Sequence, residues 1–278
     1  MPLEGLRWSR DSGSALYDTP QTAVLGRAGG GNSVAIYFSS NNLYYPDTTE
    51  CLENTIYKKD RYEWTKLMID RASKHIFVRD VFKTWYITGI NSQIYSIPLL
   101  LEKLKNEVDG YDEIITIGSS AGGYAASLFG SLLKADIVIS FNGQWELNSV
   151  ICNHGYPRLE TLRDLYGEFY DIVPFVGKTN NIFYFVSSKS KWDMEQVQYS
   201  RKLSLHRIYF RTSHHGIPFP KIALPYVLNL RKEDLLKMAD KTYLPFIFAI
   251  KRCGLMQTCM FLFNEITRKF KINKCKLW

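Results

Sequence analysis

Residues 113–123 read EIITIGSSAGG, and this stretch decides the fold of the chain. Its first part, EIITIG at 113–118, is a short, largely apolar run, which predicts a buried strand. After residues 119–121 comes GGYAASLFGSLLK at 122–134, a run of small and apolar residues that predicts a helix. The turn between strand and helix must be tight, because bulky side chains at Gly118 or Gly122 would collide with neighbouring backbone.

Five further short apolar runs lie before and after this stretch, each bounded by polar or glycine residues. Continuous rather than alternating apolar residues predict strands that are buried on both faces, and therefore a mostly parallel central sheet with helices on both faces. Residues 97–108 and 122–134 are the expected crossover helices. The fold class is α/β. The other five runs are VAIYFSS at 34–40, HIFVRD at 75–80, DIVISFNG at 136–143, NIFYFVSS at 181–188 and HRIYFRT at 206–212.

The 278 residues are long enough for one large domain, which we expect over residues 1–240. Residues 148–176 lack a strong strand signal and are the natural place for a lid over the strand ends. Residues 241–278 are expected to form a helical basic tail, because seven Lys or Arg against one Glu lie within 251–278. Such a tail fits peripheral contact with an anionic membrane or an acidic polymer, and equally a solvated tail or a helix packed on its own domain.

Cysteine usage and hydropathy indicate a cytoplasmic protein, with the inner membrane face as its expected place of peripheral contact. The five cysteines are odd in number and scattered without a CxxC pair, as reduced thiols are. The first 14 residues carry charge and glycine where a secretory signal needs an apolar stretch. The apolar run at 243–250 is shorter than the ~20 residues of a membrane-spanning helix. No nucleic-acid recognition motif accompanies the net charge of +8, so no nucleic-acid partner is expected.

The sequence Gly118-Ser119-Ser120-Ala121-Gly122 fits the pattern GxSxG between a predicted strand and a predicted helix. This context is typical of a nucleophile elbow, in which the central serine projects its hydroxyl above the strand ends. Ser120 is therefore the candidate nucleophile, and the backbone N–H of Ala121 is a candidate donor to the oxyanion of acyl transfer. The alternative is that Ser120 only caps the helix.

A serine hydroxyl needs a base and an acid, which in this fold follow in the order serine, acid, histidine. Asp193 comes after the strand at 181–188 and is the preferred acid, with Glu195 as the alternative. After the last strand come His214 and His215. We favour His215 as the base, because the glycine that follows it gives the loop freedom to turn the imidazole. No metal is expected, because adjacent histidines point in different directions and no carboxylate lies at ligand spacing.

Two other strand ends carry candidate binding residues. The loop after residues 34–38 should supply a second oxyanion donor, for which Ser40 and Asn41 are the candidates. Asp80 closes another strand, with Trp85 and Tyr86 nearby, so this loop could present a carboxylate and aromatic faces to a sugar-like substrate. Ordinary packing, with Asp80 as a helix cap, explains the same residues equally well.

Three segments together resemble α/β-hydrolase-like proteins associated with bacterial surface polysaccharide. They are GSSAGGYAA, which contains Ser120, the pattern RDxxxxWYxxGI at 79–90 and SHHGIPF at 213–219, and the resemblance spans about residues 34–220. It implies a triad of Ser120, Asp193 and His215 and an acyl ester on a cell-surface or capsular glycan as substrate. Members of this group resemble either esterases or O-acetyltransferases of polysaccharide biosynthesis.

Three functions therefore stand beside one another: a serine esterase, an O-acyltransferase, and a non-enzymatic accessory protein of polysaccharide assembly. The two enzymes share an acyl-enzyme and differ in whether water or a sugar hydroxyl accepts the acyl group. An esterase needs no cofactor, whereas a transferase needs a donor such as acetyl-CoA. The sequence contains neither GxxxxGK[ST] nor GxGxxG, which is weak evidence against a nucleotide-bearing donor because basic side chains can also hold phosphates.

Overall fold

The computed structural model describes residues 20–26, 31–154, 156–177 and 181–275. Its centre is a sheet of eight strands in the order β1-β3-β2-β4-β5-β6-β7-β8. All neighbours are parallel except β1, which runs antiparallel to β3 at the edge. The strands are β1 (Thr22–Gly26), β2 (Gly31–Phe38), β3 (Ala72–Val78), β4 (Glu113–Ser119), β5 (Ile137–Phe141), β6 (Ile182–Ser187), β7 (His206–Phe210) and β8 (Thr242–Tyr243).

The prediction of a mostly parallel α/β sheet is confirmed, and each of the six predicted apolar runs forms a strand. The sequence prediction missed the two outermost strands. β1 is a half-exposed edge strand without a continuous apolar run, and β8 is only two residues long. Because both lie at edges, neither needed the buried apolar character by which the inner strands are found.

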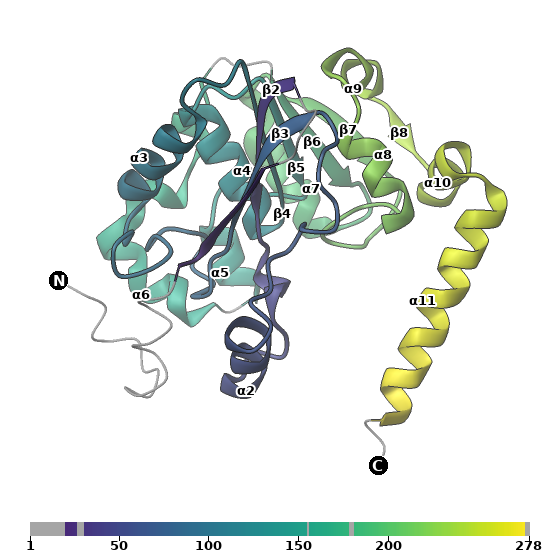
Figure 1. Ribbon diagram of the computed structural model, residues 1–278, viewed down its shortest axis with the longest axis horizontal. Helices are drawn as coiled ribbons and strands as arrows, with labels where there is room; N and C mark the ends of the chain where they lie inside the picture. Colours follow the sequence, from purple (N-terminus) through teal and green to yellow (C-terminus); the bar gives the residue numbers. More distant parts are fainter. Residues whose placement is uncertain (1–19, 27–30, 155, 178–180, 276–278) are drawn as a thin grey trace.

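Helices cover both faces of the sheet (Figure 1). One face is covered by α3 (Ile97–Val108), α4 (Ala121–Leu132), α5 (Asn148–His154), α6 (Pro157–Tyr166) and α7 (Lys191–Tyr199). The other face is covered by α8 (Leu224–Leu228), α9 (Lys232–Met238) and α10 (Pro245–Cys253). The remaining helices and turns are α2 (Thr49–Leu52), the π-helical turn Glu53–Tyr57, α11 (Leu255–Cys275) and the 3₁₀ turns Asn41–Leu43, Gly167–Tyr170, Val173–Phe175, Ser200–Lys202 and Lys221–Ala223.

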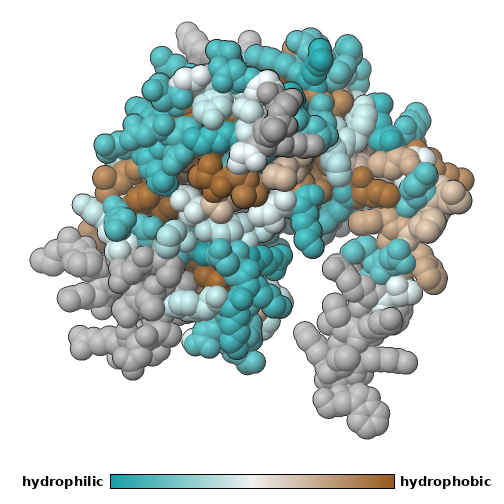
Figure 2. Space-filling view, viewed as in Figure 1, coloured by the Kyte–Doolittle hydropathy of each residue, from teal (hydrophilic) through white to brown (hydrophobic). Residues whose placement is uncertain are grey.

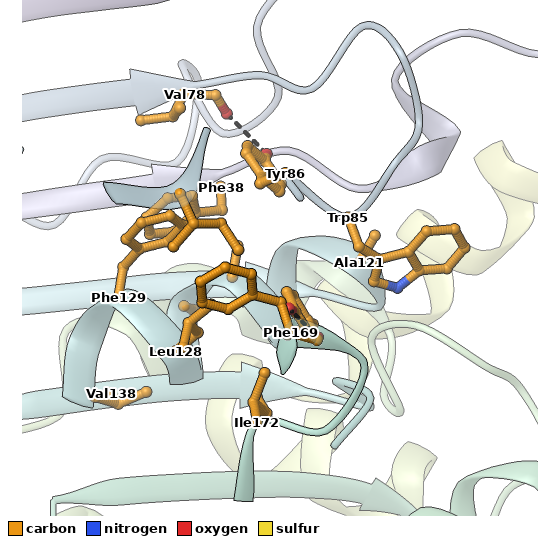
Figure 3. Packing of buried hydrophobic residues seen from close by; sticks show 14 of the residues in the cluster. Phe38, Val78, Trp85, Tyr86, Ala121, Leu128, Phe129, Val138, Phe169 and Ile172 are labelled. Carbon is orange, nitrogen blue, oxygen red and sulfur yellow. Dashed lines mark hydrogen bonds between the residues drawn. The ribbon is translucent and has the colours of Figure 1, made fainter. Parts of the chain in front are cut away.

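Successive residues of each inner strand point into different cores. In β2, Val34, Ile36 and Phe38 pack in the core beneath α3 and α4. Ala35 and Tyr37 pack in the core beneath α8 and α9. This alternation follows from the period of two along a strand, and it explains why the runs are apolar without interruption. Figure 3 shows the first core, where Phe38 stacks on Phe129 at a centroid distance of 5.4 Å.

Residues 148–154 and 156–176 form α5, α6 and two 3₁₀ turns that are packed onto the body of the protein. Leu159 and Ile172 are buried in the core beneath α4, and the Tyr124 hydroxyl donates to the carbonyl of Phe169 at 2.7 Å. The role of this segment as a lid stays a prediction.

The expected tail at 241–278 begins with β8, which pairs with β7, and with α10, whose Phe248 and Ala249 are buried. Beyond it, α11 extends away from the rest of the molecule (Figure 1). Figure 2 shows hydrophobic residues over α10 and the start of α11. None of the described helices is both long enough and apolar enough to cross a bilayer.

Candidate active site

The turn from β4 into α4 has the geometry of a nucleophile elbow. Ser120 has φ 55° and ψ −122°, a backbone conformation that is strained for a residue with a side chain. A Cβ on Gly118 would lie 1.9 Å from the carbonyl oxygen of Gly122, and one on Gly122 would lie 2.3 Å from that of Phe38. Only glycine fits at these two positions, as the sequence pattern predicts.

Three side chains from distant parts of the chain meet above the strand ends. Nε2 of His215 lies 2.8 Å from Oγ of Ser120, and Nδ1 of His215 lies 2.7 Å from Oδ1 of Asp193. The Asp193 side chain is buried at 2% exposure, whereas that of His215 is 26% exposed. An imidazole held in this way can accept the Ser120 proton on one nitrogen while the carboxylate fixes the other.

Asp193 lies in the first turn of α7 rather than in the loop where the sequence prediction put it. Ser190 caps this helix, and its hydroxyl accepts from the Asp193 N–H at 3.3 Å. Glu195, the alternative acid, is instead within 4.0 Å of Lys191 on the outer side of the helix. Helical geometry therefore decides between the two acids, because residues two positions apart point to different sides of a helix.

Two polar side chains hold the loop that carries His215. The hydroxyl of Ser187, at the end of β6, donates to the carbonyl of His214 at 2.5 Å. The amide of Asn142, directly after β5, donates both to Ser187 Oγ and to the carbonyl of Gly216 at 2.8 Å. The sequence analysis did not single out either residue, although their positions at strand ends are the signal that could have identified them.

Trp192 is a further residue at the site that the sequence analysis did not single out. Its indole stacks on the imidazole of His215 at a centroid distance of 4.1 Å and an interplanar angle of 30°. The stack covers one face of the ring and limits its rotation. His215, and not His214, bridges Ser120 and Asp193. The backbone N–H of His214 donates to Thr212 Oγ1.

The candidate oxyanion donors differ in their surroundings. Ala121 is the first residue of α4, and its N–H forms no hydrogen bond within the described residues. The N–H of Ser40 instead donates to a carboxylate oxygen of Glu63 at 2.5 Å, and the Ser40 hydroxyl lies 3.0 Å from the other oxygen. Burial raises the pKa of Glu63 above its ordinary value, against the lowering effect of the two Ser40 hydrogen bonds. Asn41, the other candidate, has a buried amide nitrogen without a hydrogen-bond partner among the described residues.

No protein-family model matches the sequence, and neither does any curated protein. Solved structures do match. The capsule O-acetyltransferase of Neisseria meningitidis serogroup A is 14% identical with a TM-score of 0.50, and the match covers 69% of this chain and 83% of that one. S-formylglutathione hydrolase from Agrobacterium tumefaciens is 11% identical with a TM-score of 0.45, covering 78% and 89%.

Three findings point to the same fold: the strand order, the elbow between β4 and α4, and the match to the capsule O-acetyltransferase. The chain has the α/β-hydrolase fold. At such low identities the likeness establishes the fold alone. In an α/β-hydrolase, ligands bind at the carboxyl ends of the strands, and Ser120, Asp193 and His215 all lie at this edge.

Asp80, Trp85 and Tyr86 do not form the sugar-binding surface that the sequence analysis considered. All three are buried, at 3%, 1% and 0% exposure. Asp80 accepts hydrogen bonds from the backbone N–H groups of Phe82, Thr84 and Tyr86, at 2.7–3.0 Å. The interpretation as a packed and capped loop, which the sequence left open, is therefore the one that the structure favours.

This loop contacts the backbone beside the candidate site. The Tyr86 hydroxyl donates to the carbonyl of Ser39 at 2.8 Å and lies 3.2 Å from that of Val78, a contact drawn in Figure 3. Trp85 donates from Nε1 to Gln144 Oε1 at 2.9 Å. Tyr86 thus fixes the backbone next to Ser40, the candidate oxyanion donor.

A cavity of about 580 Å³ opens beside His215. Residues 61–67, between β2 and β3, form much of its lining, and no described residue within 148–176 lines it. Within the described residues, no group of three or more His, Cys, Asp or Glu side chains is placed to hold a metal ion. The cavity is lined by Ser40, Asn42, Arg61, Tyr62, Glu63, Trp64, Thr65, Lys66, Leu67, Ser119, His214, His215, Gly216, Ile217, Lys221 and Leu224.

Proposed function

We propose that this α/β-hydrolase carries out serine-dependent acyl-ester chemistry through an acyl-enzyme on Ser120. The observation that carries the proposal is the hydrogen-bonded line from Ser120 Oγ through His215 to Asp193, at 2.8 and 2.7 Å. A serine that only caps a helix has no need of an imidazole on its hydroxyl, nor of a buried carboxylate behind that imidazole.

In the proposed reaction, Ser120 Oγ attacks the ester carbonyl while its proton passes to Nε2 of His215. Asp193 accepts from Nδ1–H and stabilises the imidazolium, and the N–H of Ala121 donates to the oxyanion. Collapse of the tetrahedral intermediate breaks the bond to the leaving group, which takes the proton from Nε2. A second hydroxyl group, deprotonated by His215, then attacks the acyl-enzyme and releases Ser120.

That second hydroxyl belongs to water in an esterase and to a sugar in an O-acyltransferase. We propose a cell-surface or capsular glycan as the substrate, with acetyl-CoA as donor in the case of transfer. The resemblance of the motifs and the fold shared with a capsule O-acetyltransferase support a glycan. Incubation of the glycan with acetyl-CoA, and of the acetylated glycan alone, separates the two: acetylated glycan from the first indicates transfer, and acetate released from the second indicates hydrolysis.

The test of the mechanism is intact-mass analysis after exposure to a fluorophosphonate probe. We expect one adduct on the unmodified protein and none on Ser120→Ala. His215→Ala should slow labelling and turnover on the order of 10³-fold or more. His214→Ala, the matched control, should leave both nearly unchanged, and a large loss in His214→Ala with a mild one in His215→Ala would identify His214 as the base. Folded protein that does not label would favour the accessory-protein function.

We also propose that the C-terminal helices contact an anionic membrane surface, such as the inner face of the cytoplasmic membrane. Five apolar side chains of α11 are 53–69% exposed, and the helical period of ~3.6 residues places them along one arc of the helix. Thr258 is buried on the opposite side. Lys251 and Arg252 lie in the last turn of α10, and the chain beyond Ile266 is rich in Lys and Arg. Apolar and basic side chains together fit an interfacial helix. The five are Leu255, Met256, Met260, Phe263 and Ile266.

A further inference from the structure

The cavity beside His215 carries an excess of positive charge. Three exposed cationic residues, Arg61, Lys66 and Lys221, line it, and Glu63 is the one carboxylate among the described lining residues. Neither Lys66 nor Lys221 forms an ion pair with a described carboxylate. A concave surface lined by one sign of charge raises the local concentration of ligands of the opposite sign.

Glu63 does not cancel this charge. Its carboxylate already accepts from the N–H and the hydroxyl of Ser40. Burial raises the pKa of Glu63, while Arg61 and Lys221 lie close enough for their charges to act in the opposite direction. The cations outnumber the carboxylate even when Glu63 is fully ionised, so the cavity keeps room for a second anion.

The same cavity offers hydrogen-bonding groups that suit hydroxyls. The side-chain amide of Asn42 is exposed and forms no hydrogen bond within the described residues, so it has both donors and an acceptor to offer. Glu63 has further acceptor positions on its two oxygens. The volume of about 580 Å³ lies within the range of small-ligand sites.

We propose that this cavity binds an acidic sugar unit of the glycan, with its anionic group against Lys66 and Lys221 and its hydroxyls against Asn42 and Glu63. The inference rests on the proposed function, because it assigns the cavity to the glycan whose acyl group passes through Ser120. The cavity wall includes His215 and Ser119, so a sugar bound there lies next to the imidazole that would deprotonate its hydroxyl.

Direct binding to the full chain tests the proposal without any turnover. The acidic probes are a galacturonic acid trimer and an α2,8-linked sialic acid trimer, and the neutral probe is the galactose trimer with the linkage of the first. We expect calorimetry or saturation-transfer NMR to show about fivefold or more tighter binding of at least one acidic trimer. The difference should shrink when the salt rises from about 0.05 M to about 0.5 M.

The lysines are tested by the double variant Lys66→Gln, Lys221→Gln. This variant should lose the preference for the acidic trimer, whereas Lys105→Gln, Lys202→Gln should keep it. The control removes the same two charges from exposed positions on the chain outside the cavity. Thermal unfolding of both variants verifies that they are folded.

A donor arm separates an acidic sugar from the phosphates of coenzyme A. If the double variant Lys66→Gln, Lys221→Gln binds CoA more weakly relative to pantetheine but binds the acidic trimers as the unmodified protein does, the cavity serves the acyl donor. The proposal is then overturned. It is also overturned if neither acidic trimer binds better than the neutral one. Absence of fluorophosphonate labelling on the unmodified protein would instead contradict the proposed function. The binding measurements do not depend on labelling, so the two failures can be distinguished.

Discussion

Asp193 and Glu195 are two acids of the same helix turn, and only Asp193 contacts His215. The second carboxylate oxygen of Asp193, Oδ2, is buried without a hydrogen-bond partner among the described residues. The carboxylate therefore contacts the imidazole through Oδ1. Asp193→Asn should lower the rate of fluorophosphonate labelling on the order of 10²-fold or more, a smaller loss than in Ser120→Ala. The physical reason is that an amide neither orients the neutral tautomer correctly nor stabilises the imidazolium.

The matched control is Glu195→Gln, which changes the same charge two residues away on the exposed side of α7. Its labelling rate should equal that of the unmodified protein. A loss in Glu195→Gln with none in Asp193→Asn would reverse the assignment of the acid.

For single residues, the sequence predicts which residue types lie at the elbow and after the strands, because backbone geometry and chain order constrain them. It could not predict that Ser40 would be held by Glu63, because residue 63 lies in a segment without strand or helix signal. It also could not predict the stack of Trp192 on His215, since the facing side of a short helix depends on the tertiary packing around it.

The loop at residues 79–90 is an element that the sequence marks clearly and whose role only its contacts reveal. Lys83, Trp85 and Tyr86 all have positive φ, and the Asp80 carboxylate holds the loop in this conformation through backbone N–H groups. An amide in its place turns an NH₂ group toward at least one of these donors. Asp80→Asn should therefore lower the free energy of unfolding by about 1–3 kcal/mol, measured by urea denaturation.

Asp109→Asn, at the exposed end of α3, is the control and should leave the stability unchanged. The labelling rate of Asp80→Asn should also fall, because Tyr86 fixes the carbonyl of Ser39 next to the oxyanion loop. Unchanged stability in Asp80→Asn would contradict the role of this carboxylate as the organiser of the loop.

Among the elements, the inner strands could be predicted because each is buried on both faces and so needs uninterrupted apolar residues. The segment between β2 and β3 could not, since it consists of a four-residue helix and short turns whose positions depend on contacts with the sheet. One such contact is the hydrogen bond from Trp64 Nε1 to the carbonyl of Phe38, at 3.0 Å. This segment supplies Arg61, Glu63 and Lys66 to the cavity, so the candidate binding surface was harder to predict than the candidate catalytic residues.

For the whole molecule, the exposed apolar arc of α11 predicts association with anionic vesicles. The full chain should co-sediment with phosphatidylglycerol-containing vesicles and much less with neutral phosphatidylcholine ones. A chain that ends at Gly254 should lose this association and keep its fluorophosphonate labelling. Phe263→Glu in the full chain should weaken vesicle binding about tenfold or more, because burial of one aromatic side chain is lost and a charge of the wrong sign is gained.

Leu165→Glu is the matched control, since Leu165 is 75% exposed on α6. It makes the same change of charge and should leave vesicle binding unaffected. If Phe263→Glu binds vesicles like the unmodified chain while its oligomeric state changes, the apolar arc is an interface between copies of the protein instead.

The hydrogen bond between Ser120 and His215 joins residues 95 positions apart. On the ribosome, the elbow is therefore synthesised well before its base, and β7 must pair with β6 before the loop with His215 reaches its place. By the mechanism proposed above, a nascent or prematurely terminated chain carries Ser120 as an ordinary alcohol. Reactivity then begins only when β4 to β7 have paired, so the cell meets this nucleophile solely after its base is in place.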